Sequence, residues 1–260
     1  MQAATIAFAL FEQELPEVLF LSVRVGAAML AAPLFGALSV PVQLRAFLGV
    51  ALALFIHQWV PLPALPDLLG MAGMVALVQE MVIGVTLGFV LQIAFAIPLI
   101  AAEQIAGTMG MAMTTSVDPA SGSQSGAIGQ MFSLTLIFVF MGLGAHLLWF
   151  ELLIESYRAL PPGPLGLTAE AMLRVPAFGG HMLATAAAIA LPVVLVLLLV
   201  QVATGVLSRS APSLNLFALG LPAGVLAGIA ALIAVLPVMI DQFADLSRAA
   251  VEQVSGVLVR

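Results

Sequence analysis

Long stretches without a charged residue are the feature that most limits what this chain can fold into. Residues 119–150, 175–208 and 210–240 contain no Asp, Glu, Lys or Arg. A helix of roughly 20 predominantly apolar residues is enough to cross about 30 Å of hydrocarbon. With 63% apolar and only 8% charged residues, the 260-residue chain carries more apolar surface than a soluble domain can bury. The chain is therefore expected to be embedded in a membrane.

The backbone inside a membrane must be helical or part of a closed barrel, because lipid offers no hydrogen-bond partners. The short alternating segments that are typical of barrel strands are absent from the sequence. The sequence therefore predicts an all-α polytopic membrane protein. We expect six apolar segments, of which the second is short for a span: residues 15–35, 46–60, 68–101, 127–150, 182–207 and 214–240.

Several classes of chemistry find no support in the sequence. There are no cysteines, which excludes disulfides and thiolate sites. Without lysine there is no nucleotide-binding GK[ST] motif, and a net charge of −6 argues against nucleic acid. The three histidines lie far apart in no metal-binding pattern, and the serines of residues 121–126 lack a protease arrangement. We therefore expect neither an enzyme nor a cofactor.

Arg24 and Glu80 fall within apolar surroundings, and further charges lie near segment ends: Glu103, Glu151 and Arg209. An ionised side chain at the centre of a bilayer costs roughly 2.5–3.5 kcal/mol on insertion scales, so it normally faces protein or water. Arg24 and Glu80 could pair with each other, or they could line a polar conduit. The sequence leaves both interpretations open.

Two segments carry glycines at a spacing of four, which places bare patches along one face of a helix. Gly220, Gly224 and Gly228 form such a face in the last segment, and Gly84 and Gly88 form one in the third. Small residues at this spacing are typical of close helix packing in membranes. The spacing does not tell whether the partner helix belongs to the same chain or to another subunit.

Prolines interrupt several of the apolar segments and favour bent helices, since each removes a backbone donor and crowds the preceding turn. They are Pro33, Pro98, Pro192, Pro222 and Pro237. The final residues, 241–260, differ from the rest because apolar and charged side chains alternate there at helical spacing. This pattern predicts an amphipathic helix, lying on a membrane surface or docked on a partner.

The connection between the third and fourth segments, residues 104–129, combines glycines, polar residues and alternating methionines. Glycines and an Asp-Pro pair preclude one continuous regular element, whereas thioether side chains fill irregular gaps and repack easily. A gate that moves in a narrow opening fits this composition, and so does an ordinary re-entrant or surface loop. The candidate gate residues are Gly107, Met109, Gly110, Met111, Met113, Asp118, Pro119, Gly122 and Gly126.

Short motifs along the chain together form a recognisable order. They are Pro33-Leu34-Phe35-Gly36, the run of residues 40–45, residues 103–110 followed by Asp118-Pro119, Leu191-Pro192, and Ser213-Leu214-Asn215 leading into Gly220-Leu221-Pro222. In this order, over essentially the whole chain and with matching length, they resemble the FliR family of type III secretion export-gate subunits. Injectisome counterparts of that family share the same pattern.

This resemblance implies a subunit of the flagellar export gate in the bacterial inner membrane, at the flagellar basal body. It implies FliP and FliQ as partners, with other export-apparatus membrane proteins, exported unfolded polypeptides and membrane lipid. The loop of residues 109–126 would help to close the pore. The chain would be one helical domain over residues 1–260, with a FliP-like first half, a FliQ-like hairpin at 182–240 and the terminal helix at 241–260.

The residues alone favour a non-enzymatic channel component, with the loop as its gate. A secondary transporter is the second interpretation, because broken helices often meet at a substrate site in such proteins. Against it stand the lack of an evident internal repeat and the scarcity of ion-coupling residues. A purely structural scaffold and an injectisome homologue remain further alternatives.

Overall fold

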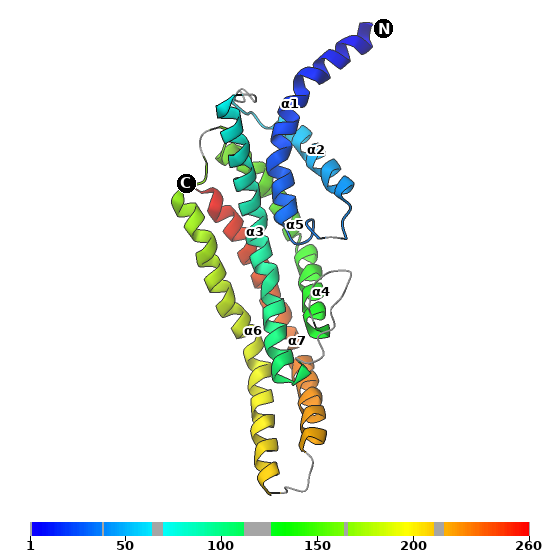
Figure 1. Ribbon diagram of the computed structural model, residues 1–260, viewed down its shortest axis with the longest axis vertical. Coiled ribbons are helices and arrows are strands. Elements are labelled where there is room, and N and C mark those ends of the chain that lie inside the picture. The colour runs from blue at the N-terminus through cyan, green and yellow to red at the C-terminus, as the bar shows by residue number, and fades with distance from the viewer. Residues whose placement is uncertain are drawn as a thin grey trace. The chain divides into compact units, whose positions relative to one another are not determined.

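The computed structural model describes residues 2–37, 39–63, 70–111, 126–163, 166–210 and 216–259, with side chains from Glu14 onward and, in the last range, from Gly220. The elements of these residues are α-helices, and no strand occurs among them. The helices are α1 (Gln2–Ala31), α2 (Val42–Trp59), α3 (Met71–Thr108), α4 (Ala127–Gly142), α5 (Ala145–Ala159), α6 (Ala169–Ser210) and α7 (Leu216–Leu258) (Figure 1).

Within the described residues, four helices are long and apolar enough to cross a membrane: α2, α3, α6 and the part of α7 from Gly220 onward. The α4–α5 pair passes the same test together, although it is bent by 67°, and counting it as one span gives five. The prediction of an all-α polytopic membrane protein is confirmed. The first of the six expected segments, in α1, is not among these spans.

Proline and glycine set the ends of most helices. Pro41 precedes α2, and the helix ends at the extended residue Val60, just before Pro61. The α3 helix ends before Gly110, whose φ of 81° suits glycine. Gly144, with a φ of 69°, separates α4 from α5, so the single apolar segment expected at residues 127–150 is bent in two.

The chain forms two compact units, and the four boundaries between them fall inside α3, α6 and α7 and after the first residue of α5. Unit 1 contains Met1–Ile93, His146–Phe178 and Ala250–Arg260, and unit 2 contains Ala94–Ala145 and Gly179–Ala249. In unit 1, α1 and α2 form a hairpin, and α3 and α5 complete the packing around α1 (Figure 1). The prediction of a single domain over residues 1–260 stays a prediction.

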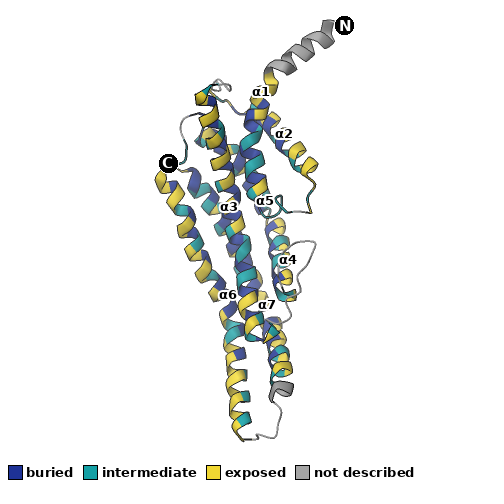
Figure 2. Ribbon diagram, in the orientation of Figure 1, coloured by how far each residue is buried: buried dark blue, intermediate teal, exposed yellow. Residues whose placement is uncertain are grey.

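Unit 2 contains the antiparallel hairpin of α6 and α7, from Gly179 on α6 and up to Ala249 on α7 (Figure 1). Much of the apolar surface of α6 in this hairpin is exposed, including Leu195, Leu199, Val202 and Val206 (Figure 2). An exposed apolar surface of this kind faces lipid or other subunits in a membrane protein.

Two expected boundaries differ from those of the structure. Residues 241–258 continue α7 without a break, rather than forming a separate terminal helix, and α7 also continues across Pro222 and Pro237. The apolar face expected there is buried within the chain: Phe243, Leu246, Ala250, Val254 and Val257. The expected loop at 104–129 is shorter at both ends, because α3 extends to Thr108 and α4 begins at Ala127.

Candidate functional site

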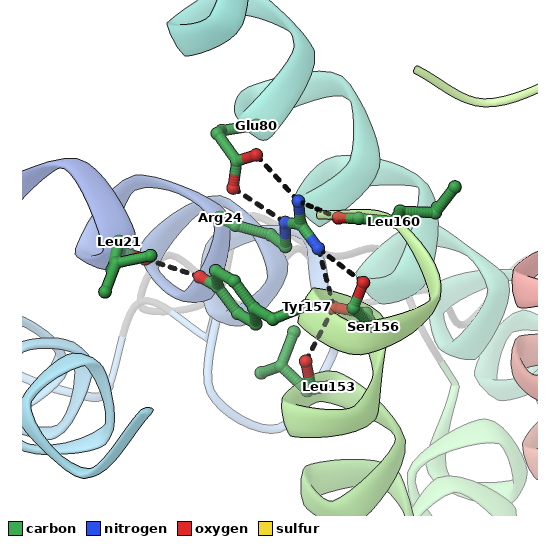
Figure 3. A network of polar contacts seen from close by, with 7 residues as sticks. All are labelled: Leu21, Arg24, Glu80, Leu153, Ser156, Tyr157 and Leu160. Carbon is green, nitrogen blue, oxygen red and sulfur yellow. Dashed lines mark hydrogen bonds and ion pairs between the residues drawn. The ribbon is translucent and has the colours of Figure 1, made fainter. Parts of the chain in front are cut away.

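Arg24 and Glu80, the two charges that the sequence places inside apolar segments, form a bidentate ion pair in unit 1 (Figure 3). The Arg24 Nε donates to Glu80 Oε2 at 2.7 Å, and the Arg24 Nη2 donates to Glu80 Oε1 at 2.6 Å. The two side chains are 0% and 1% exposed. Of the two interpretations left open by the sequence, this geometry is that of an ion pair between α1 and α3.

The same guanidinium also binds the end of α5. The Arg24 Nη1 donates to the carbonyl of Ser156 at 2.7 Å, and Nη2 donates to the carbonyl of Leu160 at 2.8 Å. The Ser156 carbonyl also accepts from the Leu160 N–H at 2.9 Å, so Arg24 is its second donor. Arg24 thus binds the C-terminal end of α5 while Glu80 neutralises the guanidinium charge, and the three helices meet at one buried centre.

Two aromatic residues of α5 strengthen this meeting point. The ring of Tyr157 lies 4.1 Å from the Arg24 Cζ, and its hydroxyl donates to the carbonyl of Leu21 on α1. Trp149 Nε1 donates to the carbonyl of Leu87 on α3 at 3.2 Å. Neither aromatic residue was predicted from the sequence as part of a site. One feature of the sequence pointed to Tyr157, which is the only tyrosine of the chain. The hydroxyl of a buried tyrosine and the N–H of a buried tryptophan usually form a hydrogen bond, so a tyrosine next to an apolar segment is a candidate for a buried polar contact.

Gly84 and Gly88 of α3 lie against α1 in unit 1. A Cβ placed on Gly84 would lie 2.9 Å from the Cβ of Ala27, and one on Gly88 would lie 2.7 Å from the Cβ of Ala31. Both values are below ordinary contact distances, so only glycine allows the two backbones to approach this closely. The neighbour of this small-residue face is thus a helix of the same chain.

The glycine face of α7 lies against the end of α3 in unit 2. A Cβ on Gly228 would lie 2.7 Å from the Met109 side chain, and one on Gly224 would lie 3.4 Å from the Met109 carbonyl oxygen. At Gly220 a Cβ would meet nothing within 4 Å. The candidate gate segment is the stretch of residues 109–126. Its first residue, Met109, is 3% exposed and packs firmly against Gly224 and Gly228.

An apolar cavity of about 340 Å³ adjoins Met109 in unit 2. Met111, at one end of the connection to α4, lines it, and so does Ala127, the first residue of α4. The wall also includes Met131, Ile229 and Leu232. The two ends of the candidate gate segment therefore meet at one methionine-lined apolar cavity.

The remaining predicted site residues are less closely surrounded. Glu103 is exposed, and a Cβ on Gly107 or Gly126 would meet nothing within 4 Å. Gly126 immediately precedes α4. Four of the candidate gate residues lie outside the described residues: Met113, Asp118, Pro119 and Gly122. The gate role of the whole set stays a prediction.

The polar and small residues of the candidate site serve helix packing in the described part of the chain. No group of three or more His, Asp or Glu residues that could hold a metal ion occurs in the part of the chain that the structure describes. The buried ionic centre has its charges paired and its helix-end carbonyls occupied. Nothing in this arrangement leaves a nucleophile beside a base.

Comparison with known proteins identifies one family and several similar proteins. The model of a family described as "Bacterial export proteins, family 1" matches residues 15–250. The chain is 33% identical over 223 residues to the flagellar biosynthetic protein FliR of Pectobacterium carotovorum subsp. carotovorum, which covers 86% of this chain and 85% of that protein. It is 31% identical to FliR of Escherichia coli strain K12, with 83% and 82% covered. It is also 31% identical to the surface presentation of antigens protein SpaR of Salmonella typhimurium, with 76% and 74% covered.

Proposed function

Because the chain belongs to family 1 of the bacterial export proteins, as its resemblance to FliR predicted, we propose that it is a subunit of the flagellar type III protein export gate. In this proposal it forms, with FliP and FliQ, the pore through which unfolded flagellar proteins leave the cell. The family match over residues 15–250 is the observation that carries the proposal. The family is a component of the export apparatus and not an enzyme, which confirms that part of the prediction.

The flagellar system is favoured over the injectisome because the FliR proteins of Pectobacterium carotovorum and Escherichia coli match 86% and 83% of the chain, against 76% for SpaR of Salmonella typhimurium. The similarity to SpaR is the reason to retain an injectisome export-gate homologue as the second candidate. In either system, the chain is a membrane protein that works beside other membrane proteins of an export apparatus. We place it in the bacterial inner membrane, at the flagellar basal body.

The buried Arg24–Glu80 ion pair argues against a secondary transporter. A coupling site in a transporter needs charged groups that can bind and release an ion or substrate. Arg24 and Glu80 are instead enclosed, bonded to each other, and joined to carbonyls of α5. This arrangement supports a structural role for the pair and so favours the export gate.

The candidate gate segment has two supporting observations within unit 2. Met109 anchors its first part on Gly224 and Gly228, and both of its ends reach the methionine-lined cavity. Thioether side chains adapt to irregular surfaces and can separate and repack at low cost. We therefore assign to residues 109–126 the closing of the pore when no polypeptide is passing.

Partner contacts are expected on the exposed apolar surfaces. The α6–α7 hairpin, which the resemblance likens to FliQ, leaves Leu199, Val202 and Ile233 exposed. Side chains of this kind would be covered by FliP and FliQ subunits in the assembled gate or by membrane lipid. The first half of the chain, likened to FliP, would occupy a FliP-like position in the ring.

Purification from the native host in a mild detergent tests the proposed function. The tagged chain is isolated, its native mass is measured, and the proteins that purify with it are identified. We expect a large complex that contains two other small hydrophobic proteins, FliP and FliQ. A lone monomer or homodimer that binds a small solute would overturn the export gate and favour the transporter.

A further inference from the structure

Arg45, in the first turn of α2, is a cation for which no carboxylate partner occurs among the described residues. Its Nη2 donates to the carbonyls of Ala37 and Val40 at 2.6 and 2.7 Å, but carbonyls do not neutralise a charge. Its Nε is buried and has no hydrogen-bond acceptor among the described residues. Among the described residues, ion pairs with a carboxylate occur at four arginines, and Arg45 and Arg209 are not among them: Arg24, Arg158, Arg174 and Arg248.

The Arg45 side chain lines an otherwise largely apolar cleft between α1 and α2, both of which belong to unit 1. The cleft has a volume of about 240 Å³, and its walls include Leu30 and Val50. Its lining also contains Gly26 and Gly49, and a Cβ on either glycine would meet nothing within 4 Å. Unlike Gly84 and Gly88, these two glycines do not serve a close helix contact, so they leave the cleft open.

The position of Arg45 along α2 corresponds to a membrane interface. At about 1.5 Å per residue, the 18 residues of α2 extend over about 27 Å, close to the thickness of the hydrocarbon layer. Arg45 lies near one end of the helix and Trp59 lies at the other, 72% exposed. Arginine and tryptophan are both favoured at the level of the lipid headgroups.

We propose that this cleft binds one anionic phospholipid of the surrounding membrane. Its headgroup phosphate pairs with the Arg45 guanidinium, and an acyl chain lies in the cleft over Gly26 and Gly49. The Arg45 charge favours an anionic lipid over a neutral one. A cation without a carboxylate partner at the end of an apolar cleft matches a molecule with an anionic head and a hydrocarbon tail. Free phosphate would satisfy the charge and leave the apolar part of the cleft empty.

The proposal is independent of the export function and is tested by lipid retention on the full chain. The protein is purified with whatever subunits accompany it, exchanged into nanodiscs that contain phosphatidylglycerol and phosphatidylcholine, and the retained lipids are counted by native mass spectrometry. We expect R45Q to lower the retention of phosphatidylglycerol about fivefold, the effect of one cation beside an anionic membrane surface. Phosphatidylcholine retention should stay unchanged in this variant.

Two further variants separate the headgroup from the tail. G49L keeps the charge but fills the cleft, and it should lower phosphatidylglycerol retention at least as much as R45Q does. R158Q removes an exposed arginine that already pairs with Glu155, so retention should match that of the parent protein. A circular dichroism spectrum like that of the parent shows that each variant is folded.

Several outcomes would overturn the proposal. Undiminished phosphatidylglycerol on folded R45Q would exclude Arg45 as the headgroup site, and undiminished retention on G49L would exclude the cleft as the tail site. Displacement of the lipid by inorganic phosphate would identify a simple anion site. Lipid that is retained by the isolated chain but absent from the purified complex would mean that a partner protein covers the cleft.

Discussion

The Met109 side chain occupies the space that a Cβ on Gly228 would need, at a distance of 2.7 Å from that position. Gly220, two turns earlier on the same face of α7, has nothing within 4 Å of its Cβ position. Both glycines lie on the same face of α7, and a Cβ would meet Met109 at Gly228 but not at Gly220. This difference allows a matched test of how firmly the first part of the gate segment is held.

Substituting Gly228 by leucine should destabilise unit 2 by about 1–3 kcal/mol, because the new side chain collides with Met109. Gly220→Leu should leave stability unchanged or raise it slightly, since leucine is a better helix former than glycine. Thermal unfolding of the detergent-purified protein measures both. Combining Gly228→Leu with Met109→Ala should recover part of the loss through a coupling of about 0.5–3 kcal/mol. Equal effects at the two glycines would mean that Met109 does not restrain α7.

Removing one partner of the buried ion pair should be far more costly than removing an exposed pair. Glu80→Ala leaves the charge of Arg24 buried and uncompensated, which we expect to cost about 3–5 kcal/mol. Glu155→Ala, which breaks the exposed pair with Arg158, should cost no more than about 1 kcal/mol. Unfolding temperatures in one detergent compare the two variants.

The double substitution Arg24→Met with Glu80→Leu sharpens this comparison. Since no charge is then left unpaired, the double variant should be more stable than Glu80→Ala. It still loses the bonds to Ser156 and Leu160, so stability should remain below that of the parent. A double variant no better than Glu80→Ala would show that the bonds to α5, rather than the charge, dominate the energy of this centre.

Close approach of α1 and α3 should depend on Gly84 and Gly88. Leucine at either position would push the two backbones apart, at a cost of at least about 1–3 kcal/mol. Gly205→Leu on α6 serves as the control, because a Cβ there meets nothing within 4 Å. The measurements are the yield of monodisperse protein and its unfolding temperature. Variants at 84 and 88 that behave like Gly205→Leu would exclude a tight α1–α3 contact.

Deleting residues 110–121 should raise the passive ion leak of the assembled complex if the segment closes the pore. The leak is measured as conductance across a planar bilayer that contains the purified complex. A deletion of residues 64–67, in the connection between α2 and α3, is the matched control and should not change the conductance. Unchanged conductance after the longer deletion would remove the gate and favour a purely structural scaffold.

Much of the fold could be predicted from the sequence because the lipid environment restricts the backbone so strongly. Uncharged runs of more than 20 residues identify helices by themselves. The two charges predicted inside other apolar segments, Arg24 and Glu80, lie together in the structure. The spacing of Gly84 and Gly88 indicated a packing face. It could not identify α1 as the neighbour, since spacing describes one helix at a time.

The bend between α4 and α5 was not predicted. Residues 127–150 contain no charge, so hydropathy shows one unbroken segment, and the break depends on the positive φ of Gly144. The role of Tyr157 was missed for a related reason. Tyr157 lies beside Arg24 because residues far apart in the sequence pack together. A contact of this kind leaves no local pattern in the sequence.

The buried ion pair also constrains how the chain can be made. Glu80 follows Arg24 by 56 residues and Ser156 follows it by 132. At roughly 5–20 residues per second, about 3–11 s pass before the carboxylate has been translated, and about 7–26 s before the α5 carbonyl has. Until then the cation of α1 has to stay in contact with water or with the insertion machinery. Although α1 precedes α3 and α5 in the chain, its buried centre therefore cannot form until α5 has been synthesised, and unit 1 is complete only with residues 250–260.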